Sequence, residues 1–289
     1  MVQVEESELR LQAFDTAVKG AAERMYKFKQ VLGLNTTSAW INTFTRESTT
    51  SALSGQSGNA IRGSPRLALP ARNSVDWARI DTIQEKHFFE DDISWEDIIS
   101  NQINVQSRTL FRITEGVVKS VDDQIYSALT NVTLETTINQ VNIATGLYWD
   151  GLSAAIIDDL GQAMQLIAED DIDASDLTCF ISPKDMRSIN TYLVGKGAQF
   201  PQLGTEAATN GRVGRLNGIN FVMANNVTAS QALIVVPKLC AEWKESAPLQ
   251  TNTTEDPFRS VRIRAVEIGS VNVLQPKAIC LIRGTQGGF

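Results

Sequence analysis

Few residues in this chain could perform catalysis. His87 is the only histidine, so a Ser-His-Asp or Cys-His arrangement would have to use it. It lies in the charged sequence E-K-H-F-F-E-D-D, where a histidine is typical of a surface or an interface rather than of a catalytic base. Residues 55–59 (G-Q-S-G-N) come close to a nucleophile elbow, but the closing glycine and the strand-to-helix context are missing. We therefore predict no catalytic residues.

Candidate metal and phosphate sites also fail on spacing. Asp171, Asp173 and Asp176 suggest calcium, but the sixth position of the loop is Asp176 instead of glycine and the twelfth is Ser182 instead of glutamate. The glycines of residues 211–218 do not match a phosphate loop, and no G-K-[ST] occurs. A solvated acidic turn and turn glycines explain these residues, so we expect no metal and no cofactor.

Cysteine usage and charge restrict the class of protein. Cys179, Cys240 and Cys280 lie in apolar, strand-like sequences without metal-ligand spacing, which is typical of buried free thiols and of a reducing cytosol. The net charge of −7 argues against broad binding to a phosphate backbone, but not against surrounding nucleic acid without gripping it. The N-terminal sequence M-V-Q-V-E-E-S-E is unlike a signal peptide, and the apolar runs are too short to span a membrane.

One charge pattern rises above background. Residues 46–72 carry four arginines against Glu47, a balance of +3, and residues 85–97 carry six acids against Lys86, a balance of −5. Two solvated faces would explain this equally well. Our hypothesis is that the basic segment 46–72, an arm of one subunit, lies on the acidic segment 85–97 of the next subunit, at the entrance of a helix. Ion pairs there would fix the register of the two subunits. The candidate intersubunit contacts are Arg46, Arg62, Arg66, Arg72, Glu90, Asp91, Asp92 and Asp97.

The first third of the chain contains elements that need a surface to lie on. Residues 7–30 carry a helical apolar stripe. Residues 40–45 and 75–85 are extended, and between them eleven of the twenty residues 45–64 are Ser, Thr or Gly. The pattern predicts a long two-stranded arm with a polar tip. Because an isolated hairpin is marginal in water, this arm requires a partner surface.

A long helix is predicted next. Residues 94–131 contain no proline, and their apolar stripe is clearest from residue 107 onward. The pattern fits either one unusually long helix or a separate first helix of about a dozen residues followed by a second. Ser94 followed by Asp97 is typical of a capping box. Gly116 in the helix interior indicates either close packing against another element or a bend point.

The rest of the chain follows an α/β pattern. Helices are predicted at 151–168 and 183–194, the second opened by Pro183. Strands are predicted at 177–182, 219–224, 232–236 and 261–268, with two more short strands within 270–283. Residues 195–215 read as a loop, and residues 245–257 are polar.

This order of elements resembles the major capsid proteins of tailed bacteriophages and related archaeal viruses, which share the Hong Kong 97-type fold. F-I-S-P-K-D-M-R-S-I at 180–189 is similar to a strand-Pro-helix step of the family's axial domain. G-R-L-N-G-I-N-F-V-M-A-N-N at 214–226 is similar to the strand that follows. V-L-Q-P-K-A-I-C-L-I-R-G at 273–284 resembles the last strand of the peripheral domain.

The resemblance implies an α+β fold with four parts. An N-terminal arm takes residues 1–36 and an extended β-hairpin loop takes 37–90. The peripheral domain with its spine helix takes 91–132 and 244–289, and the α/β axial domain takes 133–243. In this family the extended loop lies across a neighbouring subunit, which would cover the polar tip.

The function implied is that of a major capsid protein. Such subunits assemble through hexamers and pentamers into an icosahedral shell that encloses the double-stranded DNA of a tailed virus without sequence-specific binding. The localisation implied is the virion, with assembly in the host cytoplasm, and the partners implied are further copies together with portal, scaffold and cementing proteins. An encapsulin-type nanocompartment shares the fold, and a soluble α/β enzyme with a mobile lid is a second alternative.

One departure from part of the family concerns covalent cross-linking. Some members join a lysine of the extended loop to an asparagine of another subunit. This chain has no lysine between Lys29 and Lys86, so we predict that no such bond forms.

Overall fold

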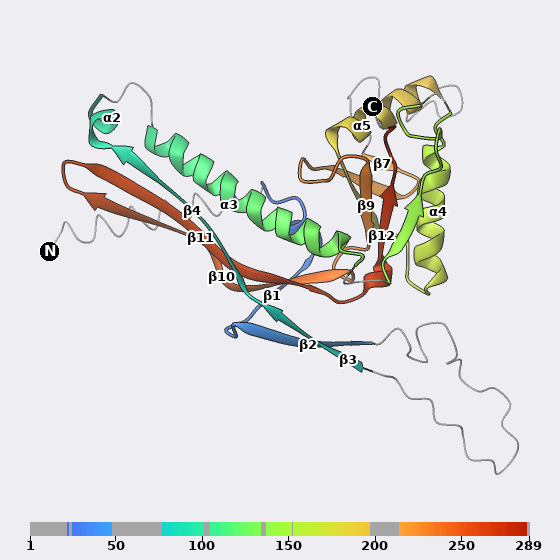
Figure 1. Cartoon of the computed structure of the whole chain (residues 1–289), viewed down its shortest axis with the longest axis horizontal. Helices are drawn as coiled ribbons and strands as arrows, with labels where there is room; N and C mark the ends of the chain where they lie inside the picture. Colours follow the sequence, from blue (N-terminus) through green and yellow to red (C-terminus); the bar gives the residue numbers. More distant parts are fainter. Residues whose placement is uncertain are drawn as a thin grey trace, which may run out of the picture. The chain divides into compact units, whose positions relative to one another are not determined.

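A computed structural model of the chain describes residues 22, 25–47, 77–100, 105–133, 137–151, 153–196 and 214–287. The chain divides into two compact units, each described here by itself (Figure 1). The first unit comprises residues 1–42, 82–128 and 242–272, and the second comprises 43–81, 129–241 and 273–289. Most of the predicted N-terminal helix, the Ser/Thr/Gly-rich tip, and most of the loop predicted at 195–215 lie outside the described residues.

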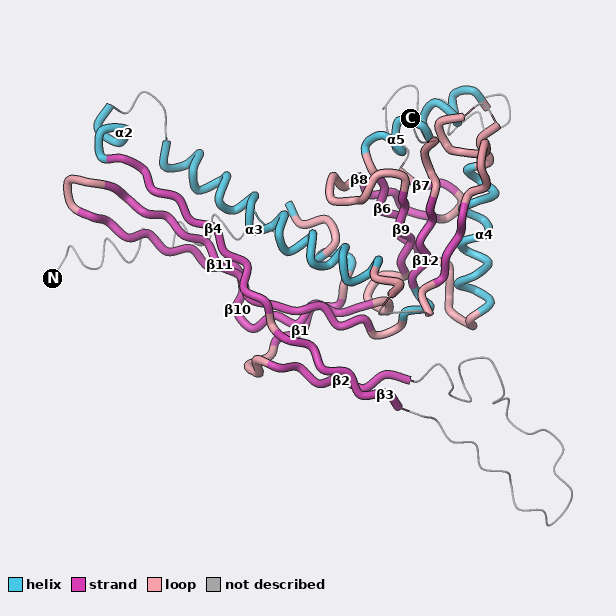
Figure 2. Tube along the Cα trace, viewed as in Figure 1, coloured by secondary structure: helices cyan, strands magenta, loops and turns pink. Residues whose placement is uncertain are grey.

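The first unit is built on a sheet of four strands in the order β1-β10-β11-β4 (Figure 2). These strands are β1 (Gly33–Thr36), β10 (Ala241–Asp256), β11 (Ser260–Val273) and β4 (Glu85–Ser94). β1 pairs parallel to β10, and β4 pairs antiparallel to β11 from Ser94 opposite Ser260 to Glu85 opposite Gly269. A turn of three residues joins β10 to β11, so these neighbouring strands form a long hairpin.

The sequence prediction was incomplete for this sheet. Residues 245–257, which carried no strand prediction, form most of β10. Residues 270–273 continue β11, so the region 270–283 supplies one new short strand instead of two. Both differences have one cause: pairing between long neighbouring strands holds polar residues such as Thr251 and Thr253 in extended backbone, whatever their hydropathy.

Among its described residues the long helical region contains two helices, which is one of the two arrangements expected. α2 (Trp95–Ser100) is short, and α3 (Val105–Thr130) carries the apolar stripe. The predicted cap is confirmed at the start of α2, where the Asp97 backbone N–H donates to Ser94 Oγ at 3.2 Å and Ser94 Oγ donates to Asp97 Oδ2 at 2.7 Å. The stripe residues Ile113, Val117 and Val121 are buried in the core.

A glycine lies against the largest buried side chain of this core. Trp243 of β10 is fully buried, and its six-membered ring lies against the backbone of Gly269 in β11. A Cβ atom at position 269 would come within 2.1 Å of Trp243 Cζ2, which no real contact allows. Gly269 therefore supplies the space that Trp243 occupies, which is a known role for glycine inside a strand.

The second unit contains a mixed sheet of six strands in the order β5-β12-β9-β6-β8-β7. These are β5 (Asn139–Asn142), β12 (Ile279–Arg283), β9 (Gln231–Val235), β6 (Leu177–Ile181), β8 (Ile219–Met223) and β7 (Arg215–Leu216). Every residue of β6 is buried, as expected for a central strand covered on both faces.

Two helices belong to this second unit. α4 (Ile156–Glu169) contacts β5 and β12 and buries Ile156, Leu160, Ala163 and Ile167; it begins at Ile156 instead of at the predicted residue 151. α5 (Pro183–Gly195) starts at Pro183, as predicted, and its N-cap Ser182 accepts the Asp185 backbone N–H at 3.1 Å. No helix among the described residues is long and apolar enough to cross a membrane.

Two strands and two 3₁₀ turns lie outside these two sheets and the helices. β2 (Ile41–Glu47) and β3 (Trp77–Ile83) form a separate two-stranded sheet, which confirms the prediction of a two-stranded arm, although its tip lies outside the described residues. A 3₁₀ turn, η1 (Lys29–Val31), precedes β1, and a second, η2 (Pro276–Ala278), precedes β12.

Candidate subunit interface

The two-stranded ribbon of β2 and β3 presents large apolar side chains to solvent. Trp77 is 65% exposed and Ile83 is 61% exposed, while Trp40 and Ile41 are each 57% exposed. Among the described residues no third strand pairs with β2 or β3. Exposed aromatic and aliphatic groups on a ribbon of two strands are typical of an interaction surface.

Polar side chains anchor the base of the ribbon within the first unit. Asn42 Nδ2 donates to Ser270 Oγ at 3.1 Å, and Gln84 Nε2 donates to the same oxygen at 3.2 Å. Thr82 Oγ1 donates to Asn272 Oδ1 at 2.6 Å. Asn42 and Gln84 are buried, so these hydrogen bonds fix the point at which the ribbon leaves β11.

The acidic segment forms strand β4 as far as Ser94 and then enters α2, whose first turn contains Glu96 and Asp97. It therefore leads directly into a helix, and residues 85–94 pair with β11. Arg262 binds Asp92 with both Nε and Nη2, at 2.8 and 3.0 Å, and Arg264 Nε donates to Glu90 at 2.6 Å. The hydrogen bond from Arg262 lowers the pKa of Asp92.

The other candidate contact residues are placed as follows. Arg46 Nη1 donates to the Val273 carbonyl oxygen at 3.3 Å in the second unit. Asp91 Oδ1 accepts the Asp92 backbone N–H at 3.0 Å, and Asp97 belongs to the cap of α2. Arg62, Arg66 and Arg72 lie outside the described residues. The pairing of this basic arm with an acidic surface on another subunit stays a prediction.

Gly116 lies in the middle of α3, which is helical without interruption from Val105 to Thr130. A Cβ atom at position 116 would lie 3.5 Å from the Phe89 ring of β4, an ordinary contact distance. The helix and the strand therefore approach each other closely here, while the possible bend at Gly116 stays a prediction.

A buried polar cluster, which sequence reasoning missed, fixes the segment before β1. Lys29 Nζ pairs with Glu267 Oε1 at 2.7 Å and with Glu245 Oε1 at 2.8 Å, and it lies 4.7 Å from the centre of the Tyr26 ring. The Tyr26 hydroxyl donates to the fully buried Glu267, and burial is the main reason that the pKa of Tyr26 is raised. A buried carboxylate held by both a cation and a hydroxyl is satisfied, so the cluster is structural.

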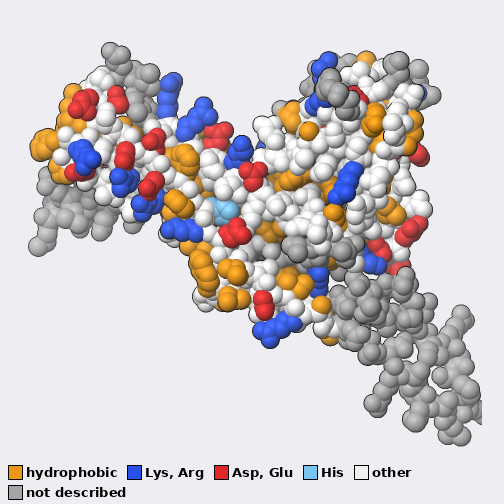
Figure 3. Space-filling model, in the orientation of Figure 1, with side chains coloured by type: hydrophobic (Ala, Val, Ile, Leu, Met, Phe, Trp, Pro, Cys, Tyr) orange, Lys and Arg blue, Asp and Glu red, His pale blue; other side chains and the backbone are white. Residues whose placement is uncertain are grey.

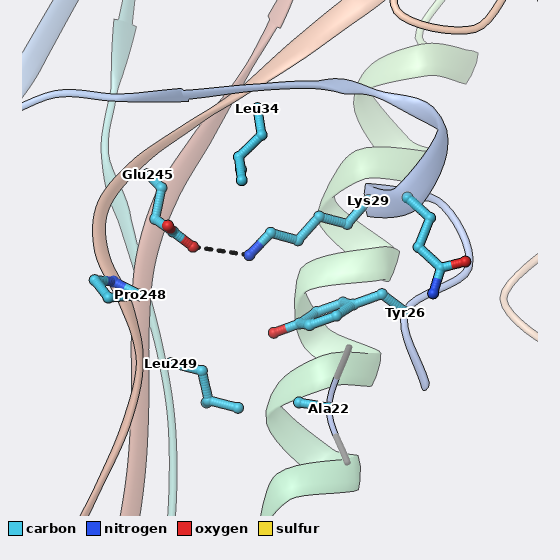
Figure 4. A pocket seen from close by; sticks show the side chains of 8 residues that line it. Ala22, Tyr26, Lys29, Leu34, Glu245, Pro248 and Leu249 are labelled. Carbon is cyan, nitrogen blue, oxygen red and sulfur yellow. Dashed lines mark hydrogen bonds and ion pairs between the residues drawn. The ribbon is translucent and has the colours of Figure 1, made fainter. Parts of the chain in front are cut away.

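The same cluster borders a pocket of about 480 Å³ (Figure 4). Leu34, Pro248 and Leu249 form its apolar wall, and Lys29 with its partner Glu245 forms the polar side. Its polar groups are already engaged, since Lys29 pairs with Glu245 and Glu267 and the Tyr26 hydroxyl donates to Glu267. The pocket therefore has the composition of a packing gap between the N-terminal segment and β10, and not that of an active site.

Asp122 of α3 holds the same segment through the backbone. Its carboxylate accepts the backbone N–H groups of Lys27 at 2.8 Å, Phe28 at 3.3 Å and Lys29 at 3.5 Å. Burial raises the pKa of Asp122 to about 6 even though these hydrogen bonds lower it. The carboxylate of Asp122 thus anchors the N-terminus of η1. Its burial opposes its ionisation, and the hydrogen bonds from the backbone partly offset that cost.

The candidate catalytic and metal residues are placed in structural roles. The expectation of a surface or interface His87 was wrong: it is buried on β4, with Nδ1 2.8 Å from Ser120 Oγ and Nε2 2.9 Å from Gln124 Oε1 of α3. In the described part of the chain no three His, Cys, Asp or Glu side chains gather as a metal site. The three cysteines are free and buried, as predicted.

Comparisons with known proteins decide the family. A family model described as phage capsid protein matches residues 89–282, which is more than half of the chain. This chain belongs to the phage capsid protein family. As predicted, the phage capsid protein has a structural role in the virion shell, which is assembled from many copies of it.

Solved structures resemble this phage capsid protein along most of its length. The capsid of cyanophage P-SCSP1u is 14% identical with a TM-score of 0.69, covering 89% of this chain and 88% of that one. A Mycobacterium phage Che8 structure is 12% identical with a TM-score of 0.65, covering 91% and 92%. A virus-like particle from Pyrococcus furiosus is 11% identical with a TM-score of 0.62, covering 95% and 99%. No curated protein sequence matches the chain.

These likenesses establish the fold. The predicted α+β, Hong Kong 97-type fold is confirmed. The predicted function of a major capsid protein that forms an icosahedral shell is confirmed as well, since it rests on the family as well as on the fold.

Proposed function

We propose that this major capsid protein assembles through hexamers and pentamers and that its shell encloses the double-stranded DNA of a tailed virus. The observation that carries the proposal is the ribbon of β2 and β3, whose apolar side chains include Trp77 at 65% exposure. A ribbon of two strands gains stability from the surface that it covers, and in this proposal that surface belongs to a neighbouring copy.

Charge gives this contact its register. We propose that Arg46, Arg62, Arg66 and Arg72 of one subunit face the acidic strand β4 and its extension, Glu90, Asp91, Asp92 and Asp97, on the next. Within the chain, Glu90 and Asp92 pair with Arg264 and Arg262 at the surface. Because exposed ion pairs contribute little, an incoming arginine can share these carboxylates without a large loss.

Four further statements belong to the proposal. The domains are an N-terminal arm (1–36), an extended loop (37–90), a peripheral domain (91–132 and 244–289) and an axial domain (133–243). Within this division, residues 273–289 belong to the same compact unit as residues 129–241, because β12 pairs with β5 and β9. The partners beyond further copies are portal, scaffold and cementing proteins, and assembly takes place in the host cytoplasm.

The protein has no enzymatic activity and no cofactor. The net charge of −7 fits a container that holds DNA without binding it tightly.

Electron microscopy of the purified protein tests the proposal. Closed icosahedral particles that contain DNA after production in an infected host would support it. Particles with protein cargo in place of DNA would favour an encapsulin-type compartment. A species of only a few subunits under all conditions, measured by size-exclusion chromatography, would favour an enzyme and refute the proposal.

The charge hypothesis has a separate test. The double variant Arg62→Glu with Arg66→Glu is expected to impair assembly, because like charges then face each other across the contact. The matched control is Lys184→Glu with Arg187→Glu, which makes the same charge change on the exposed side of α5. Normal particles from the arm variant, at the yield of the control, would contradict the hypothesis.

A further inference from the structure

The turn between β10 and β11 displays an aromatic side chain in an unfavourable backbone conformation. Phe258 has a φ of 62° and is 83% exposed. A bulky residue in the left-handed region is an outlier, since its Cβ crowds the following carbonyl group. Neither backbone preference nor burial within the chain accounts for a phenylalanine here, and such outliers concentrate at functional sites.

Phe258 belongs to a larger apolar group at this end of the first unit. Its ring lies edge to face with Trp95, with ring centres 5.9 Å apart, and the Trp95 backbone N–H donates to the Arg259 carbonyl oxygen at 3.0 Å. Ile99, one helical turn after Trp95 on α2, is 64% exposed. We name Trp95, Ile99 and Phe258 the aromatic knob. Hydrophobic side chains are visible at this end of the unit in Figure 3.

The surroundings of the knob carry a definite charge. Its neighbours in sequence are Glu96, Asp97, Glu255 and Asp256, against Arg259, and all five are exposed. Four acids and one base leave a balance of −3 around an apolar centre. An apolar centre with a charged rim is the composition of a protein–protein contact, and it requires a partner with an apolar centre and a basic rim.

A surface of that composition exists on the same unit. Arg108, Phe111 and Arg112 are exposed in the first turns of α3, at positions i, i+3 and i+4, so they share one face of the helix. Phe111 is 49% exposed. Arg112 pairs with Glu115 at 3.0 Å, an exposed contact that a stronger partner can replace. Arginines also stack favourably on tryptophan and phenylalanine rings.

We propose that the aromatic knob of one copy docks on the Arg108–Phe111–Arg112 face of a second copy. This inference rests on the proposed self-assembly and names residues of one contact within it. The two surfaces differ, so the contact is head-to-tail, and contacts of this kind close into rings when the rotation between copies permits. The arrangement leaves the ribbon of β2 and β3 available for a different neighbour.

The knob is tested with Phe258→Gly, because this change removes the ring and also relieves the backbone. If Phe258 serves the fold, the variant melts at a lower temperature than wild type. If it serves the contact, the variant melts at the same or a higher temperature and loses self-association, measured by mass photometry and electron microscopy. Asn217→Gly is the matched control, since Asn217 has a φ of 52° in the second unit and relief of its backbone removes no aromatic group.

A charge exchange identifies the partner surface. Arg108→Glu with Arg112→Glu is expected to abolish assembly, and adding Glu96→Arg with Glu255→Arg in the same chain is expected to restore it. Particles from Phe258→Gly at wild-type yield, or absence of rescue by the charge exchange, would overturn this inference. A wild-type chain that stays monomeric in the same assay would instead overturn the proposed function, so the two failures are distinguishable.

Discussion

Replacing Gly269 by alanine is expected to destabilise the first unit, because the added methyl group has no room. The new Cβ would lie 2.1 Å from Cζ2, 2.4 Å from Cε2 and 2.9 Å from Cη2 of Trp243. Contacts between carbon atoms begin near 3.5 Å, so the indole ring would have to move by more than about 1 Å.

The surroundings of Trp243 resist that movement. The side chain is fully buried, its ring centre is 6.2 Å from that of His87, and Lys29 Nζ is 5.7 Å from the ring. Overpacking of a core costs about 1–3 kcal/mol, and this overlap belongs at the upper end, about 3 kcal/mol. For a chain of this size such a loss lowers the melting temperature by about 5 °C.

Urea titration followed by tryptophan fluorescence and circular dichroism measures the effect. The Gly161→Ala control introduces the same methyl group in α4, where a Cβ meets nothing within 4 Å, and it is expected to stabilise by about 0.5–1 kcal/mol. Trp243→Phe removes the ring atoms that clash, so Gly269→Ala should cost less in that background. A Gly269→Ala variant as stable as wild type, or an equal cost in both backgrounds, would refute this account of the core.

Three further predictions concern single contacts. Because burial raises the pKa of Asp122 to about 6, the folded protein binds this proton more tightly than the unfolded chain does. The free energy of unfolding should therefore fall by about 2 kcal/mol as pH rises from 4 to 7, and Asp122→Asn should lack that share of the slope in denaturant titrations. Ser182→Ala should cost about 2 kcal/mol because it deprives the buried Asp185 of a hydrogen bond, whereas Ser94→Ala, at the exposed cap of α2, should cost less than about 1 kcal/mol; equal costs would contradict the assignment. Particles boiled in denaturant should run as monomers on a gel, since residues 30–85 contain no lysine, and a ladder of covalent oligomers would show otherwise.

Local patterns predicted much of the fold. Four predicted features depend on residues within a few positions of one another: the stripe of α3, the cap of α2, the start of α5 at Pro183 and the extended ribbon strands. Periodicity and capping act over that range, which explains why one sequence was sufficient for these elements.

The features that were missed depend on distant residues. Glu267 accepts hydrogen bonds from Tyr26 and Lys29, which come from the other end of the chain. No local sequence pattern links these residues. His87 reads as a surface residue beside charged neighbours, but strand β4 turns it towards α3. A lysine near two glutamates of different strands becomes recognisable as a cluster only when the strand order is known.

The three buried thiols have a practical consequence for labelling. Cys179, Cys240 and Cys280 have no exposed surface, and burial raises the pKa of Cys240 and Cys280 to about 12, so their reactive thiolate form is scarce at neutral pH. Air oxidation and maleimide reagents should therefore leave them unchanged. A single cysteine introduced at an exposed position would be the only group to react, which permits dyes or cargo to be attached to assembled particles without first removing the native sulfurs.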